Sequence, residues 1–231
     1  MNTWLSGTNN IYRESPWLLF VDLDWSSLTN GLEPEHFKKG SFVYHQNQTS
    51  KYVYLIKSGR VNLSIVNADG KERGLFICGE GAIFGEISNF VSPENCAQAY
   101  VVSDSLIYKI KKTHFQALFS SDSIIANNTA IILAKKVRAM TAHMESMMFP
   151  DAIKRVANVL LYLAAQYGKP CDDGTMLTIS FSHQELANLI GTSRVTVTNA
   201  FKQLAENGAV SKSRGHIKIL NEERLLAVLS W

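Results

Sequence analysis

Hydrophobic positions recur at helical spacing in two neighbouring segments near the C-terminal end of the chain. Ser182 and Glu185 form an S-x-x-E capping box at the start of the first segment. Gly191 follows its apolar face and can adopt the left-handed backbone of a sharp turn. The second segment has apolar residues at i, i+4 and i+7, which are Val197, Phe201 and Leu204. Residues 182–207 are therefore predicted to form two helices joined by a tight turn, a helix-turn-helix.

The second of these helices is predicted to leave base-reading side-chain types on its outer faces. With the apolar face turned inward, the outer positions are Arg194, Val195, Thr198, Asn199 and Lys202. Arg suits the acceptor edge of guanine, Asn suits adenine, and a small apolar side chain can contact a thymine methyl group. The pattern favours DNA reading over its alternative, an ordinary helical hairpin in a soluble core.

A basic turn follows the hairpin and strengthens this interpretation. Gly208 ends the second helix, and an alternating segment over residues 217–219 comes after the sequence SKSRGH. We interpret this region as a two-stranded wing, which makes the whole a winged helix-turn-helix that binds double-stranded DNA. The candidate DNA-contacting residues are His183, Ser193, Arg194, Val195, Thr196, Thr198, Asn199, Lys202, Lys212 and Arg214.

The period changes to that of short strands over residues 37–110. The predicted strands are rich in β-branched and aromatic residues and cover residues 42–44, 52–56, 61–66, 75–77, 97–102 and 105–110. Turn residues separate them at Gly40, Ser58-Gly59, Asp69-Gly70 and residues 79–81. With one or two further short strands, seven or eight in all, these segments predict an antiparallel barrel or sandwich. Residues 26–36 before it predict a short helix.

A long helix is predicted between the strands and the helix-turn-helix, with cap candidates at residues 121–123. Its apolar residues alternate spacings of four and three, the heptad pattern of a helix that pairs with a second helix. Packing only against its own barrel is the alternative, and Ile125, Ile131 and Ile132 indicate that it packs there too. We favour a homodimer, because two recognition helices related by a two-fold axis can read a palindrome. The predicted dimer interface comprises Ala130, Leu133, Val137, Met140, Met144 and Met147.

Phe149, Pro150 and Asp151 form a predicted hinge, because proline disfavours helical geometry in the residue before it. A new amphipathic helix over residues 152–167 follows the hinge. The predicted fold class is α+β. Its expected domains are a β-barrel over residues 1–120, a dimerisation helix and hinge over 121–149, and a winged helix-turn-helix over 150–231.

Composition is that of an ordinary globular protein, with 231 residues, 46% hydrophobic residues and a net charge of +3. Residues 183–220 hold five Lys or Arg against two acidic residues, a modest footprint for phosphate contacts. No membrane-spanning run and no signal peptide is recognised, so we expect a cytoplasmic protein without a membrane partner. The three cysteines, Cys78, Cys96 and Cys171, lie in no C-x-x-C pattern and are expected to be buried free thiols.

A barrel with the turn Phe84-Gly85-Glu86-Ile87, a long helix, an F-x-D hinge and a winged helix-turn-helix together resemble the cyclic AMP receptor protein / FNR family of bacterial transcription regulators. The resemblance covers residues 37–220. It implies that an effector bound between the barrel and the long helix reorients the two recognition helices. RNA polymerase is a further partner if the protein is an activator. The effector-binding candidates that the resemblance implies are Phe84, Gly85, Glu86, Ile87, Asn95, Cys96, Lys136 and Met140.

Departures from the family pattern narrow the choice of effector. Cyclic-nucleotide binders have an Arg-Ser pair for the cyclic phosphate where this chain has Asn95 and Cys96, and their nucleobase-contacting Thr-Ser pair is Met140-Thr141 here, so cyclic AMP is disfavoured. The N-terminal cysteine cluster of the iron–sulfur branch is missing, and the scattered histidines do not indicate a haem, so we expect neither cofactor. A small organic effector remains.

The chain looks most similar to the branch that controls reductive dehalogenation genes and senses halogenated phenolic acids. Lys136 or Lys135 on the long helix could supply the cation for an acidic effector, although a solvated helix face is the more ordinary interpretation of either lysine. A cyclic-nucleotide-responsive regulator of the same family stays as an alternative. So does a small-molecule-binding dimer that does not bind DNA.

Base preference and enzyme activity can also be addressed from the residues. Family members often use a Glu and an Arg, four residues apart, to read a half-site with G·C pairs, and Val195 and Asn199 stand there instead. The expected half-site is therefore richer in A·T. We expect no enzyme, because no nucleophile elbow, H-E-x-x-H run or phosphate-binding loop is present, and the histidines are too scattered for a cupin-like metal site.

Overall fold

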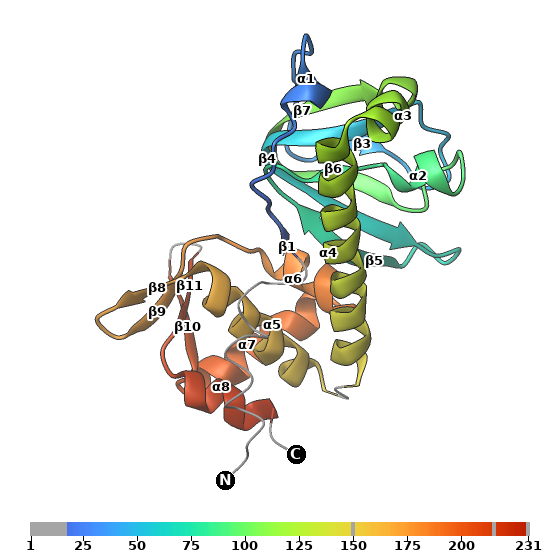
Figure 1. The fold of residues 1–231 in the computed structure, drawn as a ribbon. Helices are drawn as coiled ribbons and strands as arrows, with labels where there is room; N and C mark the ends of the chain where they lie inside the picture. Colours follow the sequence, from blue (N-terminus) through green and yellow to red (C-terminus); the bar gives the residue numbers. More distant parts are fainter. Residues whose placement is uncertain (1–17, 149–150, 214–215, 230–231) are drawn as a thin grey trace. The chain divides into compact units, whose positions relative to one another are not determined.

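The computed structural model describes residues 18–148, 151–213 and 216–229. The chain divides after Met140 into two compact units, so the long helix contributes residues to both. The first unit is a rolled β-sheet with helices, and the second is a helical unit with a small sheet (Figure 1). The mixed α+β fold predicted from the sequence is confirmed. Phe149 and Pro150 of the predicted hinge lie outside the described residues.

The sheet of the first unit has seven strands in the order β1-β5-β4-β7-β2, with β3 on β7 and β6 on β4. All neighbours are antiparallel except β1 and β5, which are parallel. We call this rolled sheet the barrel. Its strands are β1 (Leu18–Leu19), β2 (Glu35–Phe37), β3 (Phe42–Tyr44), β4 (Tyr52–Val66), β5 (Glu72–Cys78), β6 (Ile83–Phe84) and β7 (Gln98–Lys111).

Strands β4 and β7 are longer than predicted, because Ser58 and Gly59 form a bulge and not a turn. The pairing register between β4 and β7 shifts across this point, and the two strands continue on both sides of it. Gly59 has φ +95°, and a Cβ there would lie 2.5 Å from the carbonyl oxygen of Asp104. Glycine thus permits the close approach of the two strands. The predicted hairpin at Asp69-Gly70 is confirmed between β4 and β5.

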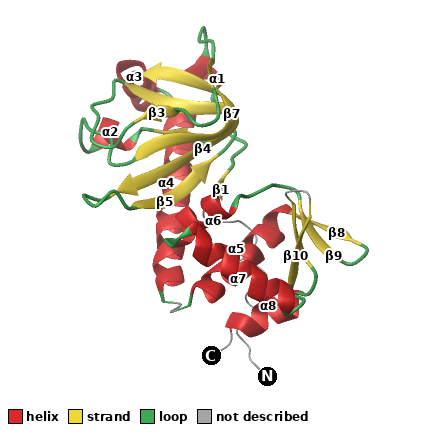
Figure 2. Cartoon of the chain, turned by 180° about the vertical axis from the view of Figure 1, so that it is seen from behind, coloured by secondary structure: helices red, strands yellow, loops and turns green. Residues whose placement is uncertain are grey.

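Helices cover one side of this sheet (Figure 2). The long helix α4 is capped by Asp122, whose Oδ1 accepts a hydrogen bond of 2.9 Å from the amide of Ile124. Ile125 and Ile132 of α4 pack into one core cluster of the barrel, and Ala139 packs into the other. The helices of this unit are α1 (Ser26–Thr29), α2 (Ile87–Phe90), α3 (Lys112–Ser121) and α4 (Ser123–Met147).

The helical predictions for this unit need two corrections: one predicted helix is shorter, and one helix was missed. The helix expected over residues 26–36 is a single turn, α1, after which Gly31 takes a positive φ of 71° and the chain proceeds to β2. Helix α3 was not predicted, because its polar residues hide the apolar face formed by Phe115 and its neighbours.

The second unit contains the predicted helix-turn-helix, preceded by a helix with the predicted bounds. Its elements are α5 (Ala152–Tyr167), β8 (Gly168–Cys171), β9 (Gly174–Leu177), α6 (His183–Ile190), α7 (Arg194–Glu206), β10 (Val210–Ser213), β11 (His216–Ile219) and α8 (Glu222–Leu229). The predicted two-stranded wing is part of a four-stranded sheet in the order β10-β11-β9-β8. Pro170 is tolerated in β8 because β8 is an edge strand.

No single helix among the described residues is long and apolar enough to cross a membrane. Helices α3 and α4 meet the length and composition only when counted together, and they are bent by 108° at the break between them.

Candidate functional site

The helix-turn-helix is held in shape by hydrogen bonds of its own polar residues. In the capping box, Ser182 Oγ accepts from the Glu185 amide at 3.1 Å, and the Glu185 carboxylate accepts from the Ser182 amide at 2.8 Å. Gly191 adopts the left-handed conformation, with φ 66° and ψ 50°. Ser193 Oγ then accepts from the Thr196 amide at 3.1 Å and caps α7. These local predictions are confirmed.

The outer face of α7 presents the predicted side chains to solvent. Val197, Phe201 and Leu204 are buried, as their spacing predicts. The exposed residues of the helix include Arg194, Val195, Thr198, Asn199 and Lys202. Val195 is 68% exposed, so its side chain is available for an apolar contact. Ser193 and Thr196 are less available, since their hydroxyl groups hydrogen-bond to each other at 2.8 Å.

His183 joins the two helices of the motif. Its ring stacks on Phe201 with centroids 4.9 Å apart, and its Nδ1 lies 2.9 Å from Thr198 Oγ1. Thr198 Oγ1 donates its proton to the Arg194 carbonyl oxygen, so we assign the Nδ1–H of His183 as the donor to Thr198. His183 therefore positions α7 on α6, in addition to any contact that it makes with DNA.

Three basic side chains converge at the start of α7. Burial lowers the pKa of His183, and the nearby Lys212 and Arg194 lower it further. Burial and the nearby Arg194 likewise lower the pKa of Lys212. The repulsion between the cations Arg194 of α7 and Lys212 of β10 would be relieved by an anion between them, such as a backbone phosphate. Arg214, the other cation predicted for the wing, lies outside the described residues.

In the barrel, the predicted effector residues surround the turn from β6 into α2. Phe84 is fully buried, and Gly85 adopts a positive φ of 79° that lets the chain turn against the ring of Tyr54. Ser88 Oγ donates a hydrogen bond of 2.7 Å to the Gly85 carbonyl oxygen. This turn directs the Glu86 carboxylate into the protein interior, where its side chain has no exposed surface.

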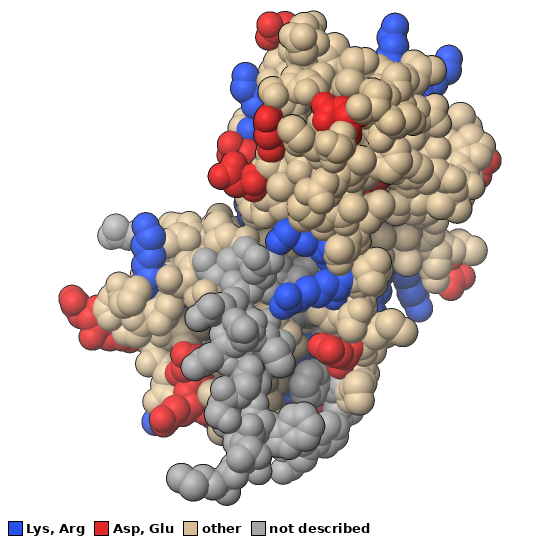
Figure 3. Space-filling view, in the orientation of Figure 1, with Lys and Arg blue, Asp and Glu red and all other residues tan. Residues whose placement is uncertain are grey.

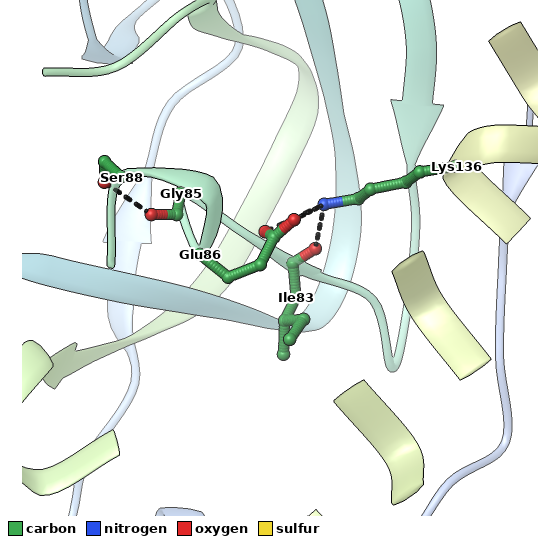
Figure 4. Close-up of polar contacts among 5 residues, drawn as sticks. All are labelled: Ile83, Gly85, Glu86, Ser88 and Lys136. Carbon is green, nitrogen blue, oxygen red and sulfur yellow. Dashed lines mark hydrogen bonds and ion pairs between the residues drawn. The ribbon is translucent and has the colours of Figure 1, made fainter. Parts of the chain in front are cut away.

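Lys136 of α4 enters the same interior and pairs with Glu86 (Figure 4). Its Nζ donates to the two carboxylate oxygens at 2.7 and 2.8 Å and to the Ile83 carbonyl oxygen at 3.1 Å. All three protons of the ammonium group thus have acceptors, which a buried cation requires. The more ordinary interpretation of Lys136, a solvated helix face, was wrong. Helical spacing could place Lys136 on α4 but could not show which barrel residue it would meet.

A small cavity of about 30 Å³ adjoins this ion pair. It has room for about one water molecule, so an organic effector can enter only if the surrounding side chains move. Asn95 is buried beside it, Cys96 and Ile87 are exposed at its edge, and Met140 packs against the barrel core. The cavity is lined by Tyr44, Leu63, Leu75, Phe76, Gly85, Glu86, Ile87, Ser88, Asn95, Cys96, Ala97 and Lys136.

Comparison with known proteins agrees with both halves of this architecture. The cyclic nucleotide-binding domain family matches residues 34–122, and the Crp-like helix-turn-helix domain family matches residues 154–228. The cyclic AMP receptor protein of Thermus thermophilus is 31% identical over 218 residues, covering 89% of this chain and 97% of that protein. The chain belongs to the cyclic AMP receptor protein / FNR family of transcription regulators.

Other relatives extend the comparison. A CRP-like cAMP-activated global transcriptional regulator of Mycobacterium tuberculosis is 27% identical, covering 87% of this chain and 89% of that protein. Among solved structures, a mutant of CooA from Carboxydothermus hydrogenoformans has a TM-score of 0.79 at 21% identity and covers 94% of this chain and 100% of that chain. A complex of CprK with OCPA has a TM-score of 0.74 at 18% identity, covering 91% of this chain and 98% of that chain. These structures share the fold.

Members of the cyclic AMP receptor protein / FNR family are effector-responsive transcription regulators that bind DNA and act as dimers. The expectation that the protein is a regulator and not an enzyme is therefore confirmed.

Most residues of the predicted dimer seam on α4 are exposed in the single chain, as expected for a surface that would be covered by a second copy. Val137, Met144 and Met147 are 65%, 67% and 57% exposed, which is high for large apolar side chains. Ala130 is also exposed, and Leu133 is half-buried. Met140 differs from the rest, because it packs against its own barrel. One helix thus carries both the buried Lys136 and the apolar seam.

The cysteines are free, but only Cys78 is buried. Burial raises the pKa of the Cys78 thiol to about 12, so this thiol stays protonated and unreactive. Cys96 is exposed and Cys171 is partly exposed, which corrects the expectation of three buried thiols. Within the described residues, no three His, Cys, Asp or Glu side chains gather as metal ligands. The expected absence of an iron–sulfur cluster and of haem stays a prediction.

We expect Lys136→Met to lower the free energy of unfolding by about 3–5 kcal/mol, because it leaves the Glu86 carboxylate buried without a partner. The double variant Glu86→Leu/Lys136→Met should recover most of this loss, since apolar replacement of both partners is often neutral. Urea-induced unfolding of the wild type, both single variants and the double variant measures the coupling. Additive losses in the double variant would contradict the ion pair.

Proposed function

We propose that this regulator is a cytoplasmic homodimer that binds palindromic, A/T-rich promoter DNA and responds to a small organic anion held by Lys136. A halogenated aromatic acid is the effector class that we favour. The observation that carries the proposal is the buried ammonium group of Lys136 at the junction of α4 and the barrel. An iron–sulfur cluster or haem has no part in the proposal.

The chemistry around Lys136 suits an acid with an apolar ring. A carboxylate or phenolate could take over the ammonium protons that now contact Glu86. Leu63, Leu75, Phe76 and Ala97 form an apolar lining next to this cation, which favours a ring with apolar substituents such as chlorine. Entry of such an acid would free the Glu86 carboxylate. Because that charge is costly to leave buried, the β6–α2 turn would have to move away from α4.

Such a movement offers a route from the effector to DNA. Lys136 and the seam residues Val137 and Met144 belong to the same helix. A change in how α4 packs on the barrel would therefore change how the seam meets its partner in the dimer. This would alter the spacing of the two recognition helices on a palindrome. RNA polymerase would be a further partner if the operator lies where the protein activates transcription.

A cyclic nucleotide is the second candidate, favoured by the names of the Thermus and Mycobacterium relatives. Its phosphate would need a cation at the positions of Asn95 and Cys96, and both side chains are uncharged. Lys136 is the cation that lines the pocket, and it is already paired with Glu86. These features weigh against a cyclic phosphate.

Binding of chlorophenolic acids tests the effector class. At about 100 times the dissociation constant, a ligand adds about 2.7 kcal/mol of stability, which should raise Tm by about 5–10 °C. Lys136→Met should abolish the rise in Tm, whereas Lys135→Met on the same helix should retain it. Thermal unfolding is measured with the chlorinated acids, their chlorine-free parent acids and cyclic AMP. A response to cyclic AMP together with none to the acids would overturn the proposed effector.

The exposed face of α7 supports the proposed base preference. Asn199 can donate to and accept from adenine, and Val195 can contact a thymine methyl group. Arg194 can contact a guanine edge or a phosphate, and so can Lys212, which lies near it.

We expect Asn199→Ala to lose about 1–3 kcal/mol of discrimination at one base pair of each half-site. Lys212→Ala is the matched control, because a lost phosphate contact should weaken binding to all sequences alike and reduce the salt slope by about 1. Affinities for a set of single-substitution duplexes, measured over a salt series, separate the two effects. Equal losses on every duplex for Asn199→Ala would rule out base reading by this residue.

A further inference from the structure

A second and larger cavity lies in the barrel, away from Lys136. It measures about 320 Å³, within the size range of small-ligand sites. Residues of β2, β3, β4 and β7 and of the loop before β4 line it. We call it the tyrosine pocket, and its principal lining residues are Phe37, Val43, Tyr44, Tyr52, Tyr54 and Asn95.

The tyrosine pocket has stiff aromatic walls. The rings of Tyr44 and Tyr54 lie 5.5 Å apart between centroids, and those of Tyr52 and Tyr54 lie 6.3 Å apart. Tyr54 also stacks on the buried Phe84 at 5.1 Å, which fixes its ring against the core. Aromatic walls of this kind favour flat ring compounds over flexible chains.

Charge at this pocket is largely balanced. Lys109 Nζ lies 3.2 Å from the Glu35 carboxylate and 4.9 Å from the centre of the Tyr52 ring. Both partners of this ion pair line the pocket, and the pair is partly exposed. Lys51 is the remaining charged residue of the lining, and it is exposed. Charged side chains on the face drawn in Figure 3 likewise occur in small groups among uncharged atoms. The pocket therefore selects weakly for a charged ligand.

The polar group that sets the chemistry of this pocket is the side-chain amide of Asn95. Asn95 is 4% exposed, and neither its Oδ1 nor its Nδ2 has a hydrogen-bond partner among the described residues. Its backbone is fixed, since its carbonyl oxygen accepts from the Asn47 amide at 2.8 Å and its amide donates to the Gln48 carbonyl oxygen at 3.0 Å. A buried amide without partners destabilises a folded protein, so a rigidly held one points to a ligand that completes its hydrogen bonds.

We propose that the tyrosine pocket binds a neutral, flat ring compound with a hydrogen-bond donor and an acceptor side by side, such as an aromatic carboxamide or a lactam. The side-chain amide of Asn95, which is buried in the ligand-free protein, turns toward that edge, with Oδ1 accepting and Nδ2 donating a hydrogen bond. The ring packs against the tyrosine side chains that line the pocket. This site is distinct in place and in charge preference from the anion site proposed at Lys136.

Asn95 and Tyr44 also line the small cavity beside Lys136, so the two sites share a wall. A ligand in the tyrosine pocket would hold Asn95 in place, and the binding of an anion at Lys136 would respond to it. The second site would thus give the barrel a second input.

The test uses the full-length protein with benzamide and nicotinamide as probes, and with toluene and benzoate as comparisons that lack the neutral donor–acceptor edge. Binding is followed by ligand-observed NMR and by calorimetry. Wild type and Glu94→Ala, at an exposed neighbour of Asn95 that lines neither cavity, should bind at least one amide more tightly than toluene and benzoate. Asn95→Leu, which keeps the branched shape of the side chain but removes its polar atoms, should weaken that binding by about tenfold or more.

Ligand-free stability supplies an independent measurement. Because Asn95→Leu removes an unpartnered buried amide, it should raise Tm by about 2–4 °C. Amide binding that Asn95→Leu leaves within twofold of wild type would overturn the proposal, and so would failure of both amides to bind. Failure of the amides to bind leaves the chlorophenolic acids as the proposed effector, because that proposal is tested separately by the loss of acid binding in Lys136→Met.

Discussion

The buried ion pair between Glu86 and Lys136 is the constraint on which the effector half of the molecule depends. Neither charge could stay in the interior alone, because the loss of hydration would cost several kcal/mol for each. Together they tie the β6–α2 turn to α4 through three hydrogen bonds. An anionic ligand that binds Lys136 would compete with Glu86 for its ammonium group. Such a ligand would therefore act on the contact that ties the turn to the helix.

At the other end of the chain, the same rule of satisfied polar groups shapes the DNA-reading surface. The capping box of α6, the Ser193 cap of α7 and the contact of His183 with Thr198 hold the motif rigid through short local bonds. Rigidity there leaves Asn199 and Val195 exposed on a fixed face, which base reading requires. Continuity between the two ends comes from α4, whose residues belong to both compact units.

Local signals in the sequence predicted much of this, and they failed where distant residues decide. Ser182, Glu185 and Gly191 act within a few residues, so the helix-turn-helix could be placed closely. Gly59 looked like a turn because a bulge needs the same backbone freedom, and only the strand opposite it distinguishes the two. The partner of Lys136 is 50 residues away in sequence, and the walls of the tyrosine pocket come from four strands. No periodicity carries that information.

The most direct test of the account is the DNA affinity of the Glu86→Leu/Lys136→Met double variant, compared with wild type on the same palindromic duplex at the same salt concentration. Neither substituted residue lies in the DNA-reading unit, and both belong to the contact that ties the turn to α4. The account predicts that the double variant stays folded and dimeric but that its affinity for the duplex changes by about tenfold or more. A folded, dimeric double variant with unchanged affinity would contradict it.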